Sequence, residues 1–235
     1  MDRPRGQGDN LVEHINEQGD PNFNVGGVDR ELPPELQLEQ LLSYMDATYE
    51  PSENYLALLP DRITHAAMLM LGSAVDHTMP GVAFAKNVTV DDSPFGPVFR
   101  PVEPNNTWCI SLYDGPPSAR EYSWRPEVAG AAELSGTTIL DLDDLSQAAD
   151  AVAYAREQGA AHVTAWAFGS ATPPEADATI LTFPTTPRKA DFIQVGTLDD
   201  HGISGEVYHS THYISTPAEA RRRVSDVASF LGNRR

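Results

Sequence analysis

One stretch of this chain, residues 161–170, constrains the fold most, and it reads AHVTAWAFGS. An apolar, strand-like run leads into a turn in which the small residues Ala165 and Gly169 flank a central position. This is the layout of a nucleophile elbow, where the backbones of strand and helix approach so closely that only small flanking residues fit. The central position is Ala167, whose methyl group has no lone pair and no proton to transfer. The pattern therefore predicts the architecture of an enzyme with an elbow and the absence of its nucleophile.

Composition narrows the classes of partner. The chain has 235 residues, 40% of them hydrophobic, which suffices for one substantial core. Its formal net charge is −18, and because phosphate backbones attract Lys and Arg rather than Asp and Glu, we expect no nucleic-acid partner. No stretch approaches the roughly 18 consecutive apolar residues of a membrane-spanning helix. The first ten residues lack the apolar segment of a secretory signal, so we expect a cytoplasmic protein with no membrane span.

Cysteine content excludes two further classes of site. Cys109 is the only cysteine, so the chain can form no internal disulfide and no multi-cysteine zinc site. It lies in a strand-like run, which favours a buried, unreactive thiol. We expect no cofactor.

The chain divides into two regions of one compact domain. Residues 1–81 are expected to form an acidic N-terminal arm and helices that pack on a core formed by residues 82–235. Four apolar residues at helical spacing mark a helix in the first region: Leu38, Leu41, Leu42 and Met45. A second helix is expected from Asp61 to Gly72.

The second region alternates strands and helices. We expect a hairpin of strands at 82–90 and 97–102 with its turn at 91–94, strands at 107–113, 138–140, 178–183, 192–196 and 206–208, and helices at 127–134 and through 145–152. The last helix begins at Thr216 with a capping box and ends at Gly232. Its Arg221-Arg222-Arg223 run is interpreted as exposed. Strand-helix alternation at this spacing favours an α/β fold with a parallel sheet and right-handed crossovers.

This order of elements resembles the α/β-hydrolase superfamily, and within it the small esterases and lipases related to hormone-sensitive lipase, over about residues 82–231. The resemblance implies a three-layer sandwich with a mostly parallel central sheet, here trimmed and preceded by N-terminal helices. Tyr113-Asp114-Gly115-Pro116 stands where such enzymes carry the His-Gly-Gly loop of the oxyanion hole. Asp114, Gly115 and Phe168 are therefore the candidate oxyanion-loop residues. Pro116 has no N–H to donate, so this loop departs from the family pattern.

The resemblance also points to an acid and a base. Asp199 follows Val195-Gly196-Thr197-Leu198, which resembles the strand end that carries the acid, and His212 stands in the loop before the last helix. Only 13 positions separate the two, where the family inserts a whole helix. Pro173-Pro174 likewise interrupts the helix that should follow the elbow. We interpret Asp199 and His212 as vestigial.

Three classes of function follow. The first is a non-catalytic protein of this fold that binds a protein partner or a small apolar or ester-like ligand. The second is a carboxylic-ester hydrolase whose serine at position 167 was replaced by alanine. The third is an enzyme with different chemistry built on Asp199, His212 or a metal. Separately, Ser170 is the nearest hydroxyl to the elbow and a candidate substitute nucleophile, but it lies three residues past the turn apex. His209 and His212 have a spacing that could hold zinc, but residues i and i+3 of an extended segment point to opposite faces, so we expect no metal site.

Overall fold

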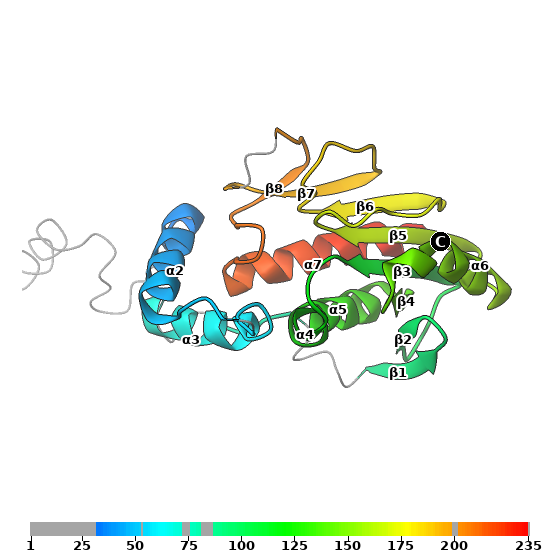
Figure 1. Cartoon of the computed structure of the whole chain (residues 1–235), viewed down its shortest axis with the longest axis horizontal. Coiled ribbons are helices and arrows are strands. Elements are labelled where there is room, and N and C mark those ends of the chain that lie inside the picture. Colours follow the sequence, from blue (N-terminus) through cyan, green and yellow to red (C-terminus); the bar gives the residue numbers. More distant parts are fainter. Residues whose placement is uncertain (1–31, 53, 72–75, 81–86, 199–201, 235) are drawn as a thin grey trace, which may run out of the picture.

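A mixed eight-stranded sheet forms the centre of the molecule (Figure 1). The computed structural model describes residues 32–52, 54–71, 76–80, 87–198 and 202–234. Strand order in the sheet is β1-β2-β4-β3-β5-β6-β7-β8. The first two pairings, β1 with β2 and β2 with β4, are antiparallel, and all other neighbours are parallel. The predicted α/β class with a mostly parallel sheet is therefore confirmed.

The elements follow the predicted alternation. The strands are β1 Val88–Ser93, β2 Gly96–Pro101, β3 Thr107–Tyr113, β4 Thr138–Asp141, β5 His162–Phe168, β6 Ala178–Thr182, β7 Phe192–Gly196 and β8 Glu206–Tyr208. The helices are α2 Pro34–Thr48, α3 Leu59–Leu71, α4 Pro117–Ala119, the π-helical turn η1 Arg120–Trp124, α5 Arg125–Ser135, the 3₁₀ turn η2 Leu145–Gln147, α6 Ala148–Glu157 and α7 Pro217–Gly232.

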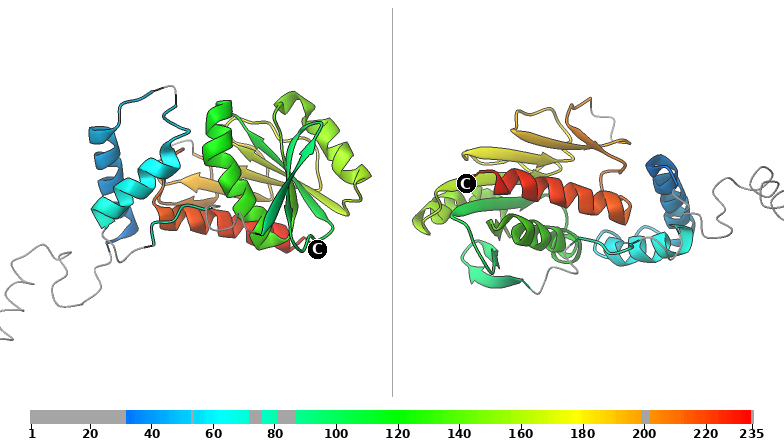
Figure 2. Two further views of the ribbon diagram at one scale, coloured as in Figure 1. Left: turned by 90° about the horizontal axis from the view of Figure 1, so that it is seen from below. Right: turned by 180° about the vertical axis from the view of Figure 1, so that it is seen from behind.

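Strand β5 lies inside the sheet, between β3 and β6 and parallel to both. Because side chains alternate across a strand, neighbouring residues of β5 enter different layers. Trp166 packs with α5 and α7 on one face, while Ala167 packs with α6 on the other. Figure 2 shows α5 and α7 side by side along their face of the sheet. The two apolar layers make this a three-layer sandwich.

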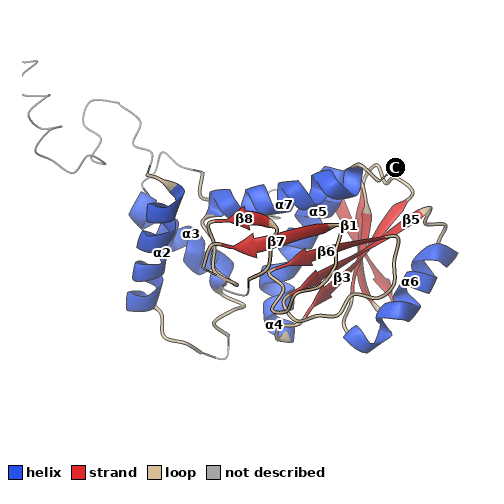
Figure 3. Cartoon of the chain, turned by 90° about the horizontal axis from the view of Figure 1, so that it is seen from above, coloured by secondary structure: helices blue, strands red, loops and turns tan. Residues whose placement is uncertain are grey.

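The α6 face has few helices over the later strands. Residues 169–177 connect β5 to β6 and residues 183–191 connect β6 to β7, and neither connection contains a helix. Of the described helices, only α6 and the short 3₁₀ turn η2 that leads into it pack on this face (Figure 3). Pro173 and Pro174 lie in the first of these connections, which agrees with the predicted interruption after the elbow.

Local signals explain where several elements begin and end. Thr216 caps α7, with its Oγ1 accepting from the Glu219 N–H at 3.4 Å, and α5 ends at Ser135 with Gly136 as its C-cap, at φ 72°. The hairpin turn differs from the prediction, because β1 continues to Ser93 and the chain reverses at residues 94–95. Gly96 then enters β2 with φ 140°, and a Cβ there would meet the Asp141 carbonyl oxygen. The first part of the predicted strand, residues 82–86, lies outside the described residues.

Helices α2 and α3 form a small layer of their own beside the sheet. Leu41 and Met45 of α2 are fully buried against Ile63 of α3 and against Ile214, which lies just before α7. The apolar stripe of α2 thus covers the loop that carries His212. Among the described helices, none is long and apolar enough to cross a membrane. Residues 1–31 lie outside the described chain, and the division at residue 81 stays a prediction.

Candidate functional site

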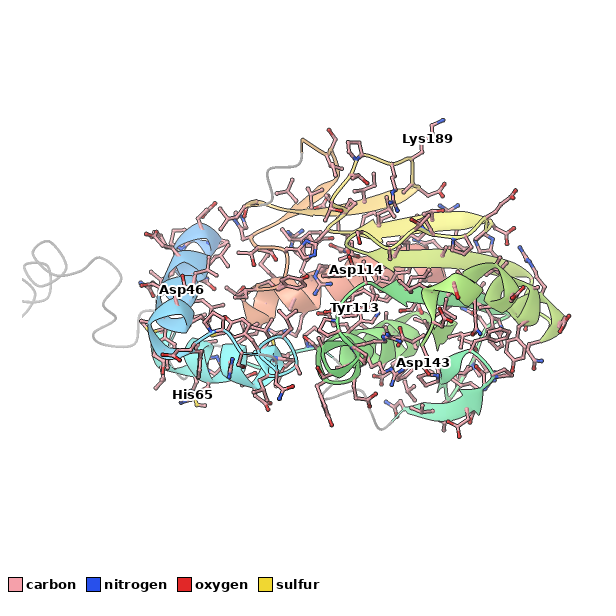
Figure 4. The ribbon with its side chains drawn as sticks, in the orientation of Figure 1. Asp46, His65, Tyr113, Asp114, Asp143 and Lys189 are labelled. Carbon is pink, nitrogen blue, oxygen red and sulfur yellow. The ribbon has the colours of Figure 1, made fainter. Side chains whose placement is uncertain are left out.

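The candidate site lies where β3 and β5 end. Because these strands are parallel neighbours, their carboxyl ends meet at one edge of the sheet, the usual place for ligands in α/β proteins. Asp114 follows β3 and Gly169 follows β5. The loop before α7 brings His212 to the same place, since its ring contacts Phe168 at the end of β5. Figure 4 shows Tyr113 and Asp114 together at this edge.

The sharp turn after β5 comes two residues later than the sequence predicts. Ala167 lies within the strand, paired between Leu112 and Leu181, and is only 2% exposed. The backbone first takes a positive φ at Gly169, with 65°. The small residues around this turn are therefore Ala167 and Ala171, and the central position carries glycine. Neither Ala167 nor Gly169 supplies a nucleophile.

The carboxylate of Asp114 fills the space over this turn. Its Oδ2 accepts a hydrogen bond of 2.6 Å from the backbone N–H of Ser170, and a Cβ built on Gly169 would lie 2.5 Å from the same oxygen. Its Oδ1 is buried and has no hydrogen-bond partner among the described residues. In an oxyanion hole, the N–H that follows the nucleophile must be open to the developing oxyanion. Here the N–H of Ser170 already donates to the Asp114 carboxylate.

The neighbouring oxyanion-loop candidates are also enclosed by aromatic rings. The Tyr113 ring folds back over Gly115 and stacks on Trp124, with 5.6 Å between ring centroids. Burial raises the pKa of the Tyr113 phenol, and the nearby Tyr213 phenol and Asp114 carboxylate raise it further. Tyr113 therefore stays protonated near neutral pH. Phe168, the third candidate, is the last residue of β5.

The predicted acid and base are placed only in part. The His212 ring centroid lies 5.0 Å from that of Phe168 and 4.4 Å from that of Tyr213. Asp199 lies outside the described residues, so the assignment of Asp199 and His212 as vestigial acid and base stays a prediction. Ser170 has an exposed side chain, and its carbonyl accepts from Arg188 at 3.4 Å.

The structure also places the candidate zinc ligand His209 and the single cysteine. Within residues 32–52, 54–71, 76–80, 87–198 and 202–234, no group of three or more His, Cys, Asp or Glu could hold a metal ion. The imidazole Nε2 of His209 lies 3.7 Å from a carboxylate oxygen of Glu35. Cys109 is fully buried, and this burial raises the pKa of its thiol.

A buried ion pair beside the site is missing from the sequence prediction. The sequence predicts Arg223 on the exposed side of the last helix, but it is 4% exposed and pairs with Glu127 of α5 at 2.5 Å. Its burial could have been predicted from helical spacing. Position 223 falls on the same helical face as the buried residues Ala220, Val224 and Val227. A charged residue on such a face indicates a partner inside the molecule.

Comparisons with known proteins find a likeness in structure but none in sequence. No protein-family model and no curated protein matches the sequence. A hormone-sensitive lipase from a metagenome library is similar in structure, with TM-score 0.53 and 11% identity over 88% of this chain and 99% of that chain. An arylesterase has TM-score 0.51 and 9% identity over 86% of this chain and 98% of its own. An esterase from Pyrobaculum calidifontis has TM-score 0.50 and 12% identity over 86% of this chain and 99% of its own.

Strand order, helix placement and these likenesses define the class of the protein, which has the α/β-hydrolase fold. Within that class, the solved structures that it resembles include a hormone-sensitive lipase, an arylesterase and an esterase. At about a tenth of positions identical, the likeness establishes the fold alone.

Proposed function

We propose that this protein is a non-catalytic member of the α/β-hydrolase fold that acts by binding a small ligand or a protein partner at the site. One observation carries the proposal: the Asp114 carboxylate accepts from the Ser170 N–H and lies against Gly169 at the turn. A single group thus blocks both the nucleophile's place and an oxyanion donor.

The energetic consequences are large. Removing the nucleophile of a working triad costs roughly a million-fold in turnover. Losing one oxyanion-hole donor costs about 100-fold to 1,000-fold more. An anion at the position of a developing oxyanion also repels it, which adds to the second loss. Ester hydrolysis at this site would therefore fall to the background rate.

The alternative of an esterase with a replaced serine at position 167 has less support. The Ala167 side chain packs in an apolar cluster with Leu112 and Leu181. A hydroxyl there would be buried inside the sheet layer, away from the turn. The Ala167→Ser variant is therefore expected to lose about 1–3 kcal/mol of stability and to gain no activity.

Turnover of short acyl esters tests the proposal. We expect the wild-type protein, Ala167→Ser and Ser170→Ala to hydrolyse p-nitrophenyl acetate at the rate of the protein-free buffer. Ser170→Ala is the matched control, because Ser170 carries the exposed hydroxyl nearest to the turn. Wild-type turnover above the buffer rate that Ser170→Ala abolishes would overturn the proposal, as would strong activity in Ala167→Ser.

A further inference from the structure

The Glu127–Arg223 pair has buried polar atoms to spare. Arg223 Nη2 donates to Glu127 Oε1 at 2.5 Å, and the two residues are 4% and 9% exposed. Among the described residues, Nε and Nη1 of Arg223 and Oε2 of Glu127 have no hydrogen-bond partner, although all three atoms are buried. Unpaired buried polar groups are costly. The pair therefore carries spare buried donors and a spare buried acceptor.

This pair lies where two hollows meet. Both hollows are lined by Glu127, Arg223 and Ser123. The first has aromatic walls, including Tyr113, Phe168 and His212. The second, of about 130 Å³, extends under α3 and is lined by apolar residues such as Leu59, Ile63 and Met79. A cavity of roughly 150 Å³ can hold a benzene molecule, so the second hollow is close to the size of one ring.

Charge selects the head group of a ligand. The pair is neutral as a whole, and Asp61 adds a carboxylate to the wall of the second hollow. The second hollow therefore has two carboxylates, those of Glu127 and Asp61, against the one guanidinium of Arg223, and a negatively charged head group gains no net attraction there. An uncharged group that both donates and accepts satisfies the spare atoms of both residues.

We propose that this cavity binds a small one-ring molecule with a carboxamide head group. Its carbonyl accepts from the Arg223 guanidinium, and its N–H donates to Glu127 Oε2. The ring lies in the apolar hollow under α3. The inference rests on the proposed function, since it names the ligand class of that binding site.

Benzamide and benzoate test the charge argument, because they share a ring and differ in the head group. Titration of the full-length protein, followed by ligand-observed NMR, is expected to give a Kd of about 1 mM or lower for benzamide. Benzoate is expected to bind at least about tenfold more weakly. Benzamide that fails to bind below about 10 mM, or benzoate that binds as tightly, would overturn the assignment.

Glu127→Gln provides the sharper test. The variant keeps the shape of the side chain but can replace the spare acceptor with an N–H donor, and it removes the carboxylate that pairs with Arg223. We therefore expect the preference to reverse, with benzoate binding about tenfold more tightly than benzamide. Glu157→Gln, on the exposed side of α6, is the matched control and should keep the wild-type preference. A Glu127→Gln protein with unchanged preference contradicts the proposal.

A second variant covers the case in which Glu127→Gln does not fold. Ser123 lines both hollows and is half-buried, so Ser123→Leu fills the space without changing a charge. It should abolish benzamide binding, and retained binding would reject this site. Ester turnover is measured on the same samples. Absence of both turnover and benzamide binding rejects the ligand class alone, whereas turnover rejects the non-catalytic function whether or not benzamide binds.

Discussion

Replacing Trp166 with alanine is expected to lower the free energy of unfolding by about 3–5 kcal/mol. Trp166 is fully buried at the centre of the sheet, and its ring centroid lies 4.6 Å from that of Trp124. Its Nε1 donates to Thr182 Oγ1 at 2.9 Å, and Thr182 in turn donates to Gln194 at 2.7 Å. The substitution therefore opens a large cavity and leaves a buried hydroxyl with one partner fewer.

Urea denaturation followed by circular dichroism measures this loss. Tyr122→Ala is the matched control, because Tyr122 is 65% exposed and its removal should change stability by no more than about 0.5 kcal/mol. A loss below about 1 kcal/mol for Trp166→Ala would contradict the placement of Trp166 in the core.

The second large effect is expected at Asp141, which ends β4. Its side chain is 0% exposed, with Ser111 donating at 2.7 Å and Arg125 at 3.0 Å. Burial raises the pKa of this carboxyl, while the hydrogen bonds from Ser111 and Arg125 oppose that rise. Asp141→Ala removes the buried partner of Arg125, which keeps only the more exposed carboxylates of Glu121 and Asp143. It also leaves the buried Ser111 hydroxyl without its acceptor, so we expect a loss of about 2–4 kcal/mol in the free energy of unfolding.

Asp143→Ala is the control for Asp141→Ala. Asp143 also pairs with Arg125, at 2.7 Å, but its side chain is 63% exposed. Exposed ion pairs contribute about 0–1 kcal/mol, so this variant should be nearly as stable as the wild type. Equal losses in the two variants would show that burial does not set the strength of these interactions.

Much of the fold can be predicted from local patterns in the sequence. The apolar run of β5 and the Thr216 cap of α7 each indicate their element without help from the rest of the chain. Strand and helix alternation then predicts parallel pairing, because a right-handed crossover places consecutive strands side by side in parallel. These signals depend only on neighbouring residues. They can therefore be recognised in this chain although it has little sequence identity to its structural neighbours.

The details of the site depend on contacts that a sequence pattern does not contain. The pattern of small residues allows the turn to be centred on either Ala167 or Gly169. The structure selects Gly169, because β5 stays paired with both neighbouring strands through Phe168. The contact between Asp114 and Ser170 joins residues 56 positions apart in the chain. The pairing of Glu127 with Arg223 spans 96 positions, although the helical spacing of Arg223 does indicate burial.

Labelling of the wild-type protein with a fluorophosphonate probe tests the central claim most directly, because the probe bonds only to an activated nucleophile. Intact-mass spectrometry counts the adducts, and digestion locates them. With glycine at the turn and the Asp114 carboxylate on the Ser170 N–H, we expect no adduct after prolonged incubation. A stoichiometric adduct on Ser170, lost in Ser170→Ala, would show a working nucleophile at this site and contradict the non-catalytic function.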